Sequence, residues 1–257
     1  MALKDYAAQV LSNRPVAQDI YEMTLRVPEL PQIAGAQFVN ILLPTREHVL
    51  RRPFCICDCD RDAETVTVCY AVVGAGTRIL SEIPSGQTLR AMLPLGNGYA
   101  PAAGSRIALV GGGMGSAVLP AVARCNPQCA FDAWIGFSDA SKVVLEERLR
   151  SLCDSVTVTT DNGSAGRRGF VTDALDEALS NARYDAVFAC GPEIMYRSLA
   201  KVAARHGVPA YVSLEQRMGC GIGACLVCNC KVKRNGEQGY ARVCKDGPVF
   251  ALEEIVL

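Results

Sequence analysis

The stretch RIALVGGGMGSAVLPAVARC (106–125) decides how the rest of the sequence is interpreted. Residues 106–113 are mostly apolar and end in glycines, which predicts a buried strand followed by a tight turn. Residues 116–125 continue with helical periodicity. A glycine turn between a strand and a helix can bind the phosphates of a dinucleotide, although Ser116 stands where the strict fingerprint has its third glycine. A turn that needs glycine only for packing is an equally good interpretation of this stretch alone.

Strand and helix patterns alternate downstream of this unit. The predicted strands are 130–137, 155–160, 184–191 and 209–216, the last of which leaves this region. The predicted helices are 143–152, 171–181 and 193–207. This alternation favours a parallel sheet with helices on both faces.

The first hundred residues have a different pattern. Segments such as 37–44 and 64–73 mix β-branched and apolar residues between turns rich in Pro, Gly and Asp, and only the short segment 77–83 looks helical. Several short strands at this spacing predict a small barrel or a sandwich.

The sequence GCGIGACLVCNC (219–230) opens a C-terminal tail that has too few apolar residues for a core of its own. Its cysteines follow a C-x4-C-x2-C spacing, and a further cysteine comes later; the four candidate ligands are Cys220, Cys225, Cys228 and Cys244. This spacing is typical of plant-type [2Fe–2S] ligation. A structural zinc site is the main alternative, although zinc modules more often use two closely spaced pairs. Cys230 is interpreted as a bystander.

Composition limits the classes of function. The chain has 257 residues, half of them hydrophobic, and 26 basic residues balance 26 acidic ones. Such a charge balance favours no nucleic-acid partner, and no apolar run approaches the length of a membrane span. The first residues do not resemble a signal peptide, so the 13 cysteines are expected to be reduced thiols or metal ligands in a cytoplasmic protein.

Two segments of the N-terminal region could bind a flavin. RRPFCIC (51–57) offers an arginine for a phosphate and an extended strand for a flat ring, although a solvated strand entry is the commoner explanation. VVGAGTRIL (72–80) places Gly76 and Thr77 before a short helix, where amides favour an anion; an ordinary helix cap is the alternative.

Taken in order, the segments RRPFCIC, GAGTRILSEI, PLGNGY, VGGGMG, ACGP and RMGCGIGACLVC…VCKDGPVF resemble one family across essentially the whole chain. It is the family of electron-transfer subunits of the bacterial NAD-linked dihydroorotate dehydrogenases, within the ferredoxin–NADP reductase-like superfamily. The resemblance implies a small antiparallel β-barrel that binds FAD (1–100), a parallel α/β domain that binds NAD (101–212) and a [2Fe–2S] segment (213–257).

The resemblance also implies which residues bind each cofactor. The expected FAD residues are Arg52, Pro53, Phe54, Cys55, Cys69, Tyr70, Ala71, Gly76 and Thr77. The expected NAD residues are Gly111, Gly112, Gly113, Gly115, Cys190, Gly191 and Pro192. Cys55 departs from the family, which usually has Ser or Thr there, and Ala75 often corresponds to Lys; both changes bear on flavin affinity. NAD rather than NADP is implied by the family alone, and Arg167 and Arg168 could meet a 2′-phosphate or form an ordinary basic turn.

The function implied is that of an oxidoreductase subunit with no catalytic acid or base of its own. A flavin can accept two electrons as a hydride and release them singly to a cluster, while the protein places the groups. The resemblance implies a partner, an FMN-containing TIM-barrel dihydroorotate dehydrogenase subunit, in a heterotetramer with two copies of each chain. Three alternatives stay open: a subunit of another flavin and iron–sulfur complex (a ferredoxin-linked transhydrogenase, a hydrogenase or a sulfur reductase), a zinc-stabilised nucleotide-binding module without redox function, and a cluster protein that has lost its flavin.

Overall fold

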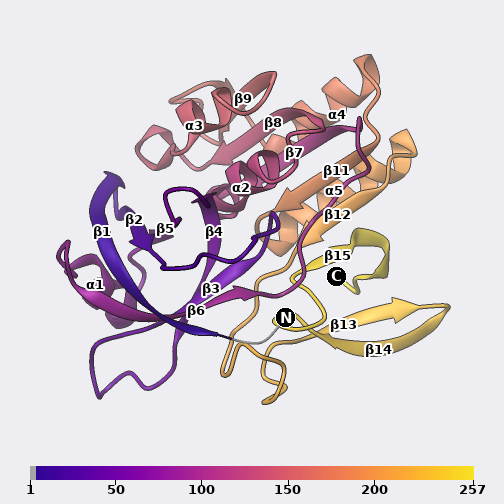
Figure 1. Ribbon diagram of the computed structural model, residues 1–257. Helices are drawn as coiled ribbons and strands as arrows, with labels where there is room; N and C mark the ends of the chain where they lie inside the picture. The colour runs from indigo at the N-terminus through magenta and orange to yellow at the C-terminus, as the bar shows by residue number, and fades with distance from the viewer. Residues whose placement is uncertain (1–3) are drawn as a thin grey trace.

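The structure, a computed structural model, describes residues 4–257 and has three parts (Figure 1). The N-terminal part is a closed antiparallel barrel with the strand order β1-β2-β5-β4-β3-β6. Its strands are β1 (Asp5–Ala17), β2 (Ile20–Arg26), β3 (Phe38–Leu42), β4 (Arg52–Asp60), β5 (Thr65–Ala71) and β6 (Thr88–Leu95). The barrel confirms the antiparallel architecture expected for the first hundred residues.

Alternation of side chains along the strands fills the barrel. On β1, Tyr6, Ala8 and Val10 are buried while the residues between them face outward. The neighbouring strand β6 alternates in the same register, so the buried residues of both strands face the inside of the barrel. The predicted short helix is α1 (Ala75–Ser81), which begins two residues earlier than the sequence indicated.

The second part is a seven-stranded sheet with the order β10-β9-β8-β7-β11-β12-β15. Its parallel strands are β7 (Arg106–Gly112), β8 (Ala130–Phe137), β9 (Ser155–Thr160), β10 (Arg167–Arg168), β11 (Ala186–Cys190) and β12 (Ala210–Ser213). The helices α4 (Val171–Asn181) and α5 (Glu193–His206) pack with Trp134 in one core. The opposite face packs against η1 (Gly113–Val118), α2 (Leu119–Arg124) and α3 (Glu146–Arg150).

Three sequence-based predictions in this part need correction. The predicted helix 143–152 is helical only over Glu146–Arg150, because Val143, which follows η2 (Ala140–Lys142), is extended and Leu145 adopts a left-handed conformation (φ 69°). The helix predicted at 116–125 starts as the 3-10 turn η1. The strand β12 is not the last of the sheet, since β15 (Val249–Ala251) returns from the tail and pairs with it in the antiparallel direction.

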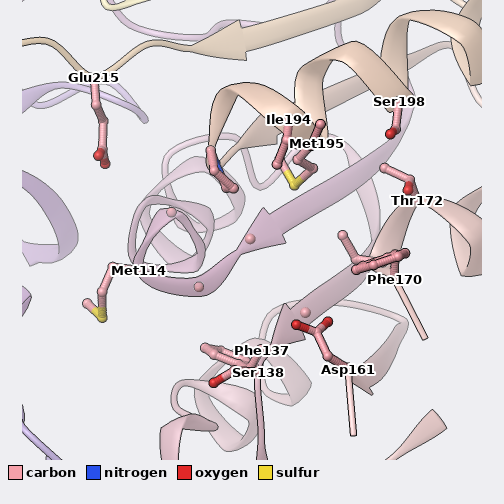
Figure 2. A pocket seen from close by; sticks show the side chains of 17 residues that line it. Met114, Phe137, Ser138, Asp161, Phe170, Thr172, Ile194, Met195, Ser198 and Glu215 are labelled. Atoms are coloured by element: carbon pink, nitrogen blue, oxygen red, sulfur yellow. The ribbon is translucent and has the colours of Figure 1, made fainter. Parts of the chain in front are cut away.

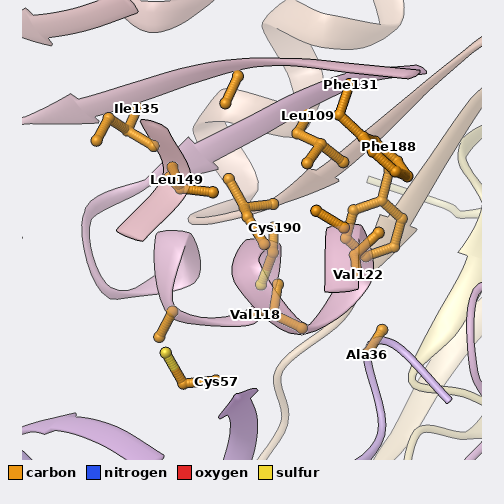
Figure 3. Packing of buried hydrophobic residues seen from close by; sticks show 14 of the residues in the cluster. Ala36, Cys57, Leu109, Val118, Val122, Phe131, Ile135, Leu149, Phe188 and Cys190 are labelled. Carbon is orange, nitrogen blue, oxygen red and sulfur yellow. The ribbon is translucent and has the colours of Figure 1, made fainter. Parts of the chain in front are cut away.

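The barrel and the sheet share one hydrophobic core. Cys57 and Cys69 of the barrel pack with Val118, Leu149 and other residues of the sheet and its helices in a single cluster. Figure 3 shows Cys57 of β4 next to Val118 and below Leu149. Continuous packing of this kind holds the two parts in a fixed relation, and any group bound between them is held by both.

The C-terminal segment forms the hairpin β13 (Asn229–Arg234) and β14 (Glu237–Arg242), then β15 and η3 (Leu252–Glu254). Its small core confirms that the tail cannot bury itself alone, since Phe38 and Leu95 of the barrel pack among Cys228, Cys244 and Phe250. Within residues 4–257, no helix combines the length and apolar character needed to cross a bilayer.

Candidate functional site

A cavity of about 540 Å³ lies at the carboxyl ends of the parallel strands. The loops after β7, β8, β9, β11 and β12 all contribute to its wall. The sheet order changes direction between β7 and β11, because β8 lies on one side of β7 and β11 on the other. Ligands of open α/β sheets bind at such a switch point, at the carboxyl ends of the strands.

Most of the residues predicted to bind NAD line this cavity. Gly112, Gly113, Gly115, Gly191 and Pro192 belong to the wall. The two predicted motifs touch each other, because a Cβ on Gly115 would come within 2.3 Å of the carbonyl oxygen of Cys190. The other two predicted residues, Gly111 and Cys190, lie beneath the wall and outside the lining; Cys190 is fully buried.

Sequence analysis missed the side chains at the far end of the cavity. Figure 2 shows Asp161 and Phe170 at the end opposite Glu215, with Ile194 between them and Glu215. Phe170 and Ile194 are large apolar residues of the wall and remain 65% and 71% exposed. Asp161 directly follows β9. Because that strand was predicted correctly, the rule that ligands bind after parallel strands could have indicated Asp161.

The predicted flavin residues of β4 and α1 come together on the barrel. The guanidinium of Arg52 lies against Gly76, at a point where a Cβ on Gly76 would be 2.5 Å from Nε. The neighbouring Arg51 donates to Asp5 at 2.8 Å, whereas the salt bridges found within residues 4–257 do not include Arg52. A guanidinium without a carboxylate partner beside a glycine backbone fits a phosphate group.

Thr77 has a second role that the sequence left open. Its hydroxyl accepts hydrogen bonds from the backbone N–H groups of Val73 (2.9 Å) and Gly74 (3.2 Å) and donates to the Gly74 carbonyl. It therefore ties the start of α1 to the preceding turn.

Aromatic residues of β2, β4 and β5 pack against one another. Tyr70 is buried, its hydroxyl donates to Asn13 at 2.8 Å, and its ring stacks on Tyr21 with centroids 6.0 Å apart. Phe54 packs on the same ring at 5.4 Å. Pro53, Cys55 and Ala71, which are also predicted flavin residues, are half-buried, and Cys69 is buried.

The flavin and NAD candidates meet at Cys55 and Cys190, with Glu215 nearby. Burial, and then the charge of Glu215, raises the pKa of the Cys55 thiol to about 12. Burial, followed by the charges of Cys55 and Glu215, also raises the pKa of Cys190. Glu215 is an exposed residue on the wall of the cavity, and partial desolvation by the protein around it raises the pKa of its carboxyl. Cys55 and Cys190 also pack in one hydrophobic cluster, so the end of this cavity lies beside the predicted flavin strand, where two flat rings could be brought into contact.

The four predicted cluster ligands lie on one segment and form two pairs. The first pair is Cys220 with Cys225, and the second is Cys228 with Cys244; in each pair the thiols are close enough to interact. Six backbone N–H groups donate to the sulfur atoms, at distances of 3.1 to 3.4 Å. The donors belong to Cys220, Ile222, Gly223, Ala224, Cys225 and Cys244.

This donor set suits sulfur that carries negative charge. Burial alone would raise the pKa of Cys220, but the N–H groups of Ile222, Cys225 and Ala224 outweigh it and lower that pKa to about 6. Gly221 and Gly223 have φ values of +72° and +85°, which aim the loop's N–H groups inward. The bystander Cys230 lies on β13, where its thiol donates to the Ala241 carbonyl.

The arrangement fits two irons better than one zinc. Within the described residues, no three Cys, His, Asp or Glu side chains converge around a point that could hold a single metal ion. A zinc site needs all of its ligands around one such point. A [2Fe–2S] cluster takes two thiolates on each iron, which matches the neighbouring pairs Cys220–Cys225 and Cys228–Cys244.

Comparisons with known proteins agree with this geometry. Residues 215–256 match the model of the iron-sulfur cluster binding domain of dihydroorotate dehydrogenase B. The chain is 39% identical to the "Dihydroorotate dehydrogenase B (NAD(+)), electron transfer subunit" of Caldanaerobacter subterraneus subsp. tengcongensis, over 97% of each chain. It is 36% identical to the protein of the same description from Streptococcus mutans, over 96% of each. A solved structure of an NADH-dependent reduced ferredoxin-NADP oxidoreductase superposes with a TM-score of 0.88 and 29% identity, over 97% of this chain and 90% of that one.

Proposed function

The chain belongs to the family of electron-transfer subunits of dihydroorotate dehydrogenase B, and from this we propose that it carries electrons between NAD(H), FAD, a [2Fe–2S] cluster and the FMN of a separate catalytic subunit. As a member of this family it is a redox subunit of an oxidoreductase. The overall reaction is oxidation of dihydroorotate to orotate with NAD+ as acceptor, in pyrimidine biosynthesis. The two thiol pairs, with six N–H donors aimed at their sulfur atoms, are the observation that carries the proposal.

The bound groups supply hydride transfer at the flavin and one-electron transfer at the cluster, and the chain's residues position them. Arg52 pairs with the FAD pyrophosphate beside Gly76 and Thr77. The strand β4, from Pro53 to Cys55, and the segment from Cys69 to Ala71 hold the flavin ring. At pH 7 the Cys55 thiol stays neutral because its pKa is about 12, so it acts only as a weak hydrogen-bond donor.

In the cavity of the sheet, the glycine turn after β7 takes the phosphates of NAD(H), and Gly191 with Pro192 borders the nicotinamide. Asp161 takes the adenosine ribose, where its negative charge disfavours the 2′-phosphate of NADP. Glu215 lines the inner end of the cavity, beside the expected ring contact. The division into a barrel (1–100), an α/β domain (101–212) and a cluster segment (213–257) is part of this proposal.

The partner meets the chain at the cluster segment. Ile222, Leu226 and Val227 lie between the cysteines and are 40%, 57% and 56% exposed, which makes an apolar patch beside the sulfur atoms. Such a patch suits a protein partner, and electrons could leave there over a short distance. We take the partner to be an FMN-containing TIM-barrel subunit, with two copies of each chain. The 13 unpaired thiols suit a reducing, cytoplasmic setting.

A second candidate function has a specific observation in its favour. The NADH-dependent ferredoxin-NADP oxidoreductase structure shares the fold over nearly the whole chain, so a subunit of such a complex would have the same cofactor sites. The higher identity to dihydroorotate dehydrogenase subunits favours the first candidate.

The purified chain tests the proposal directly. A visible spectrum with iron, sulfide and flavin analysis, before and after addition of NADH, should show one FAD and one [2Fe–2S] cluster that bleach together. The chain alone should oxidise NADH with artificial acceptors and should turn over dihydroorotate only when the catalytic subunit is added. A colourless protein with one zinc, or dihydroorotate turnover by the chain alone, would refute the proposal.

A further inference from the structure

The barrel residue Asn40 has a buried side-chain amide without a partner. It lies on β3, whose alternate residues Val39 and Ile41 face the barrel core. Phe38 and Asn40 therefore face outward, and Phe38 packs in the core of the cluster segment. Asn40 is only 1% exposed, and within the described residues neither Nδ2 nor Oδ1 makes a hydrogen bond. Most buried amides are hydrogen-bonded, so this one calls for a specific explanation.

The Asn40 amide is directed at the cysteine loop. A Cβ placed on Gly221 would come within 2.4 Å of Nδ2 of Asn40. The same Cβ would lie 3.8 Å from Cδ1 of Leu95. Gly221 separates Cys220 from the N–H donors of Ile222, Gly223 and Ala224. The amide thus reaches the loop from the barrel side, whereas every backbone donor to the sulfur atoms comes from the cluster segment itself.

An N–H group in this position has a clear chemical use. Reduction adds one electron to a [2Fe–2S] centre, and the added charge is shared by its sulfur atoms. Hydrogen bonds to those sulfur atoms stabilise the reduced form more than the oxidised form and so raise the reduction potential. In a buried setting the effect of each donor is larger than in water.

We propose that the side-chain amide of Asn40 donates a hydrogen bond to a sulfide of the [2Fe–2S] centre bound at the Cys220–Cys225 loop and raises the reduction potential of that centre. The proposal rests on the function proposed above. No bond to Asn40 forms or breaks; one electron reduces the centre, and the amide keeps its protons in both states.

The experiment uses the full chain with FAD and cluster bound. Asn40→Leu removes the amide at nearly constant volume, and Leu95→Val is the matched control, because it loosens the packing on Gly221 without removing a donor. Redox titration followed by electron paramagnetic resonance gives the midpoint potential of the cluster. At the wild-type midpoint, the ratio of reduced to oxidised cluster should fall about tenfold in N40L, which is a shift of about 59 mV for one electron. L95V should keep the wild-type ratio.

A second readout does not depend on the potential. Electron–nuclear double resonance of the reduced cluster, in H2O and in D2O, should show an exchangeable proton coupling that N40L lacks and L95V retains. If N40L fails to assemble its cluster, Asn40→Ala deletes the same amide without adding an apolar branch.

The experiment distinguishes failure of the Asn40 proposal from failure of the proposed function. A variant without the amide that has full iron and sulfide and the wild-type potential would overturn the proposal. An equal shift in L95V would also overturn it, since loop packing would then set the potential. A wild-type chain without any cluster would refute the proposed function itself, and iron and sulfide analysis detects that case before any variant is compared.

Discussion

The guanidinium of Arg52 and the backbone of Gly76 are in such close contact that a Cβ on Gly76 would lie 2.5 Å from Nε of Arg52. Gly76→Ala should therefore push Arg52 away from the start of α1 and remove the phosphate site that the two residues form. We expect FAD affinity to fall about tenfold, since the loss of one charged hydrogen bond costs about 1.5 kcal/mol or more. The fluorescence of released FAD measures this.

Gly74→Ala is the matched control for that experiment. Gly74 is two residues earlier, its φ of −170° suits any residue, and no atom lies within 4 Å of a Cβ placed there. G74A should bind FAD as the wild type does. Equal losses in the two variants would contradict a specific contact between Arg52 and Gly76.

The two thiol pairs predict which cysteines are essential. Cys225→Ser should lose most of its iron and sulfide, because a serine hydroxyl is a poor ligand compared with a thiolate. Cys230→Ser should keep its cluster, since the Cys230 thiol only donates to the Ala241 carbonyl and a hydroxyl can do the same. Colorimetric iron and sulfide analysis distinguishes the two. Loss of the cluster in C230S would make Cys230 a ligand and would contradict the pairing.

Sequence analysis predicted the parts of the site that are contiguous in the chain. The strands at 130–137 and 155–160 and the helix at 171–181 agree with the structure to the residue, because buried apolar runs and a periodic helix face leave clear patterns. The glycine turn and the cysteine spacing could be predicted because each lies within a short contiguous segment.

Other features depend on contacts that a single sequence does not contain. Asn40 and Gly221 are far apart in the chain and meet only because the cluster segment folds back on β3. Glu215 and Cys55 are also far apart in the sequence, and the fold brings the charge of Glu215 close enough to raise the pKa of Cys55. The predicted helix 143–152 starts only at Glu146, because Leu145 before it adopts a left-handed conformation that a leucine in the sequence does not indicate.

The buried carboxylate Asp132 gives the sheet a pH-dependent stability. Burial by itself would raise the pKa of Asp132, but hydrogen bonds from Ser155, Arg106 and Tyr184 outweigh it and lower that pKa. A lowered folded-state pKa adds stability above the unfolded value, near pH 4, and this stability is lost as the pH falls through the folded-state pKa. Asp132→Asn should cost about 1–3 kcal/mol at pH 7 and flatten the acid limb of the denaturation curve. An acid limb as steep as that of the wild type would contradict this assignment.

The apolar patch at the cluster predicts a variant that separates the two subunits without harming this chain. Leu226 is 57% exposed and has a φ of +60°, a conformation that aspartate tolerates better than leucine does. Leu226→Asp should therefore fold and keep NADH oxidation with artificial acceptors. Its affinity for the catalytic subunit should fall tenfold or more, because a charge would be buried at the contact.

Leu11→Asp is the control for the patch. Leu11 is 44% exposed on β1 of the barrel, away from the cysteine loop. L11D should bind the partner normally in a pull-down or by calorimetry. Normal binding by L226D would place the interface elsewhere on the chain.

Asp161 predicts the choice between the two nicotinamide cofactors. Its carboxylate lies in the cavity after β9, whereas Arg167, which could have met a 2′-phosphate, donates instead to Glu177 at 2.6 Å. Asp161→Asn should raise kcat/KM for NADPH about tenfold, because a repulsion of about 1.4 kcal/mol with the 2′-phosphate disappears. For NADH, kcat/KM should fall about fivefold, because the charged hydrogen bond to the ribose becomes a neutral one, a difference of about 1 kcal/mol. Asp154→Asn, at the exposed opposite end of the same strand, should change neither value. Steady-state kinetics with both cofactors tests this, and an unchanged NADPH preference in D161N would move the determinant to another residue.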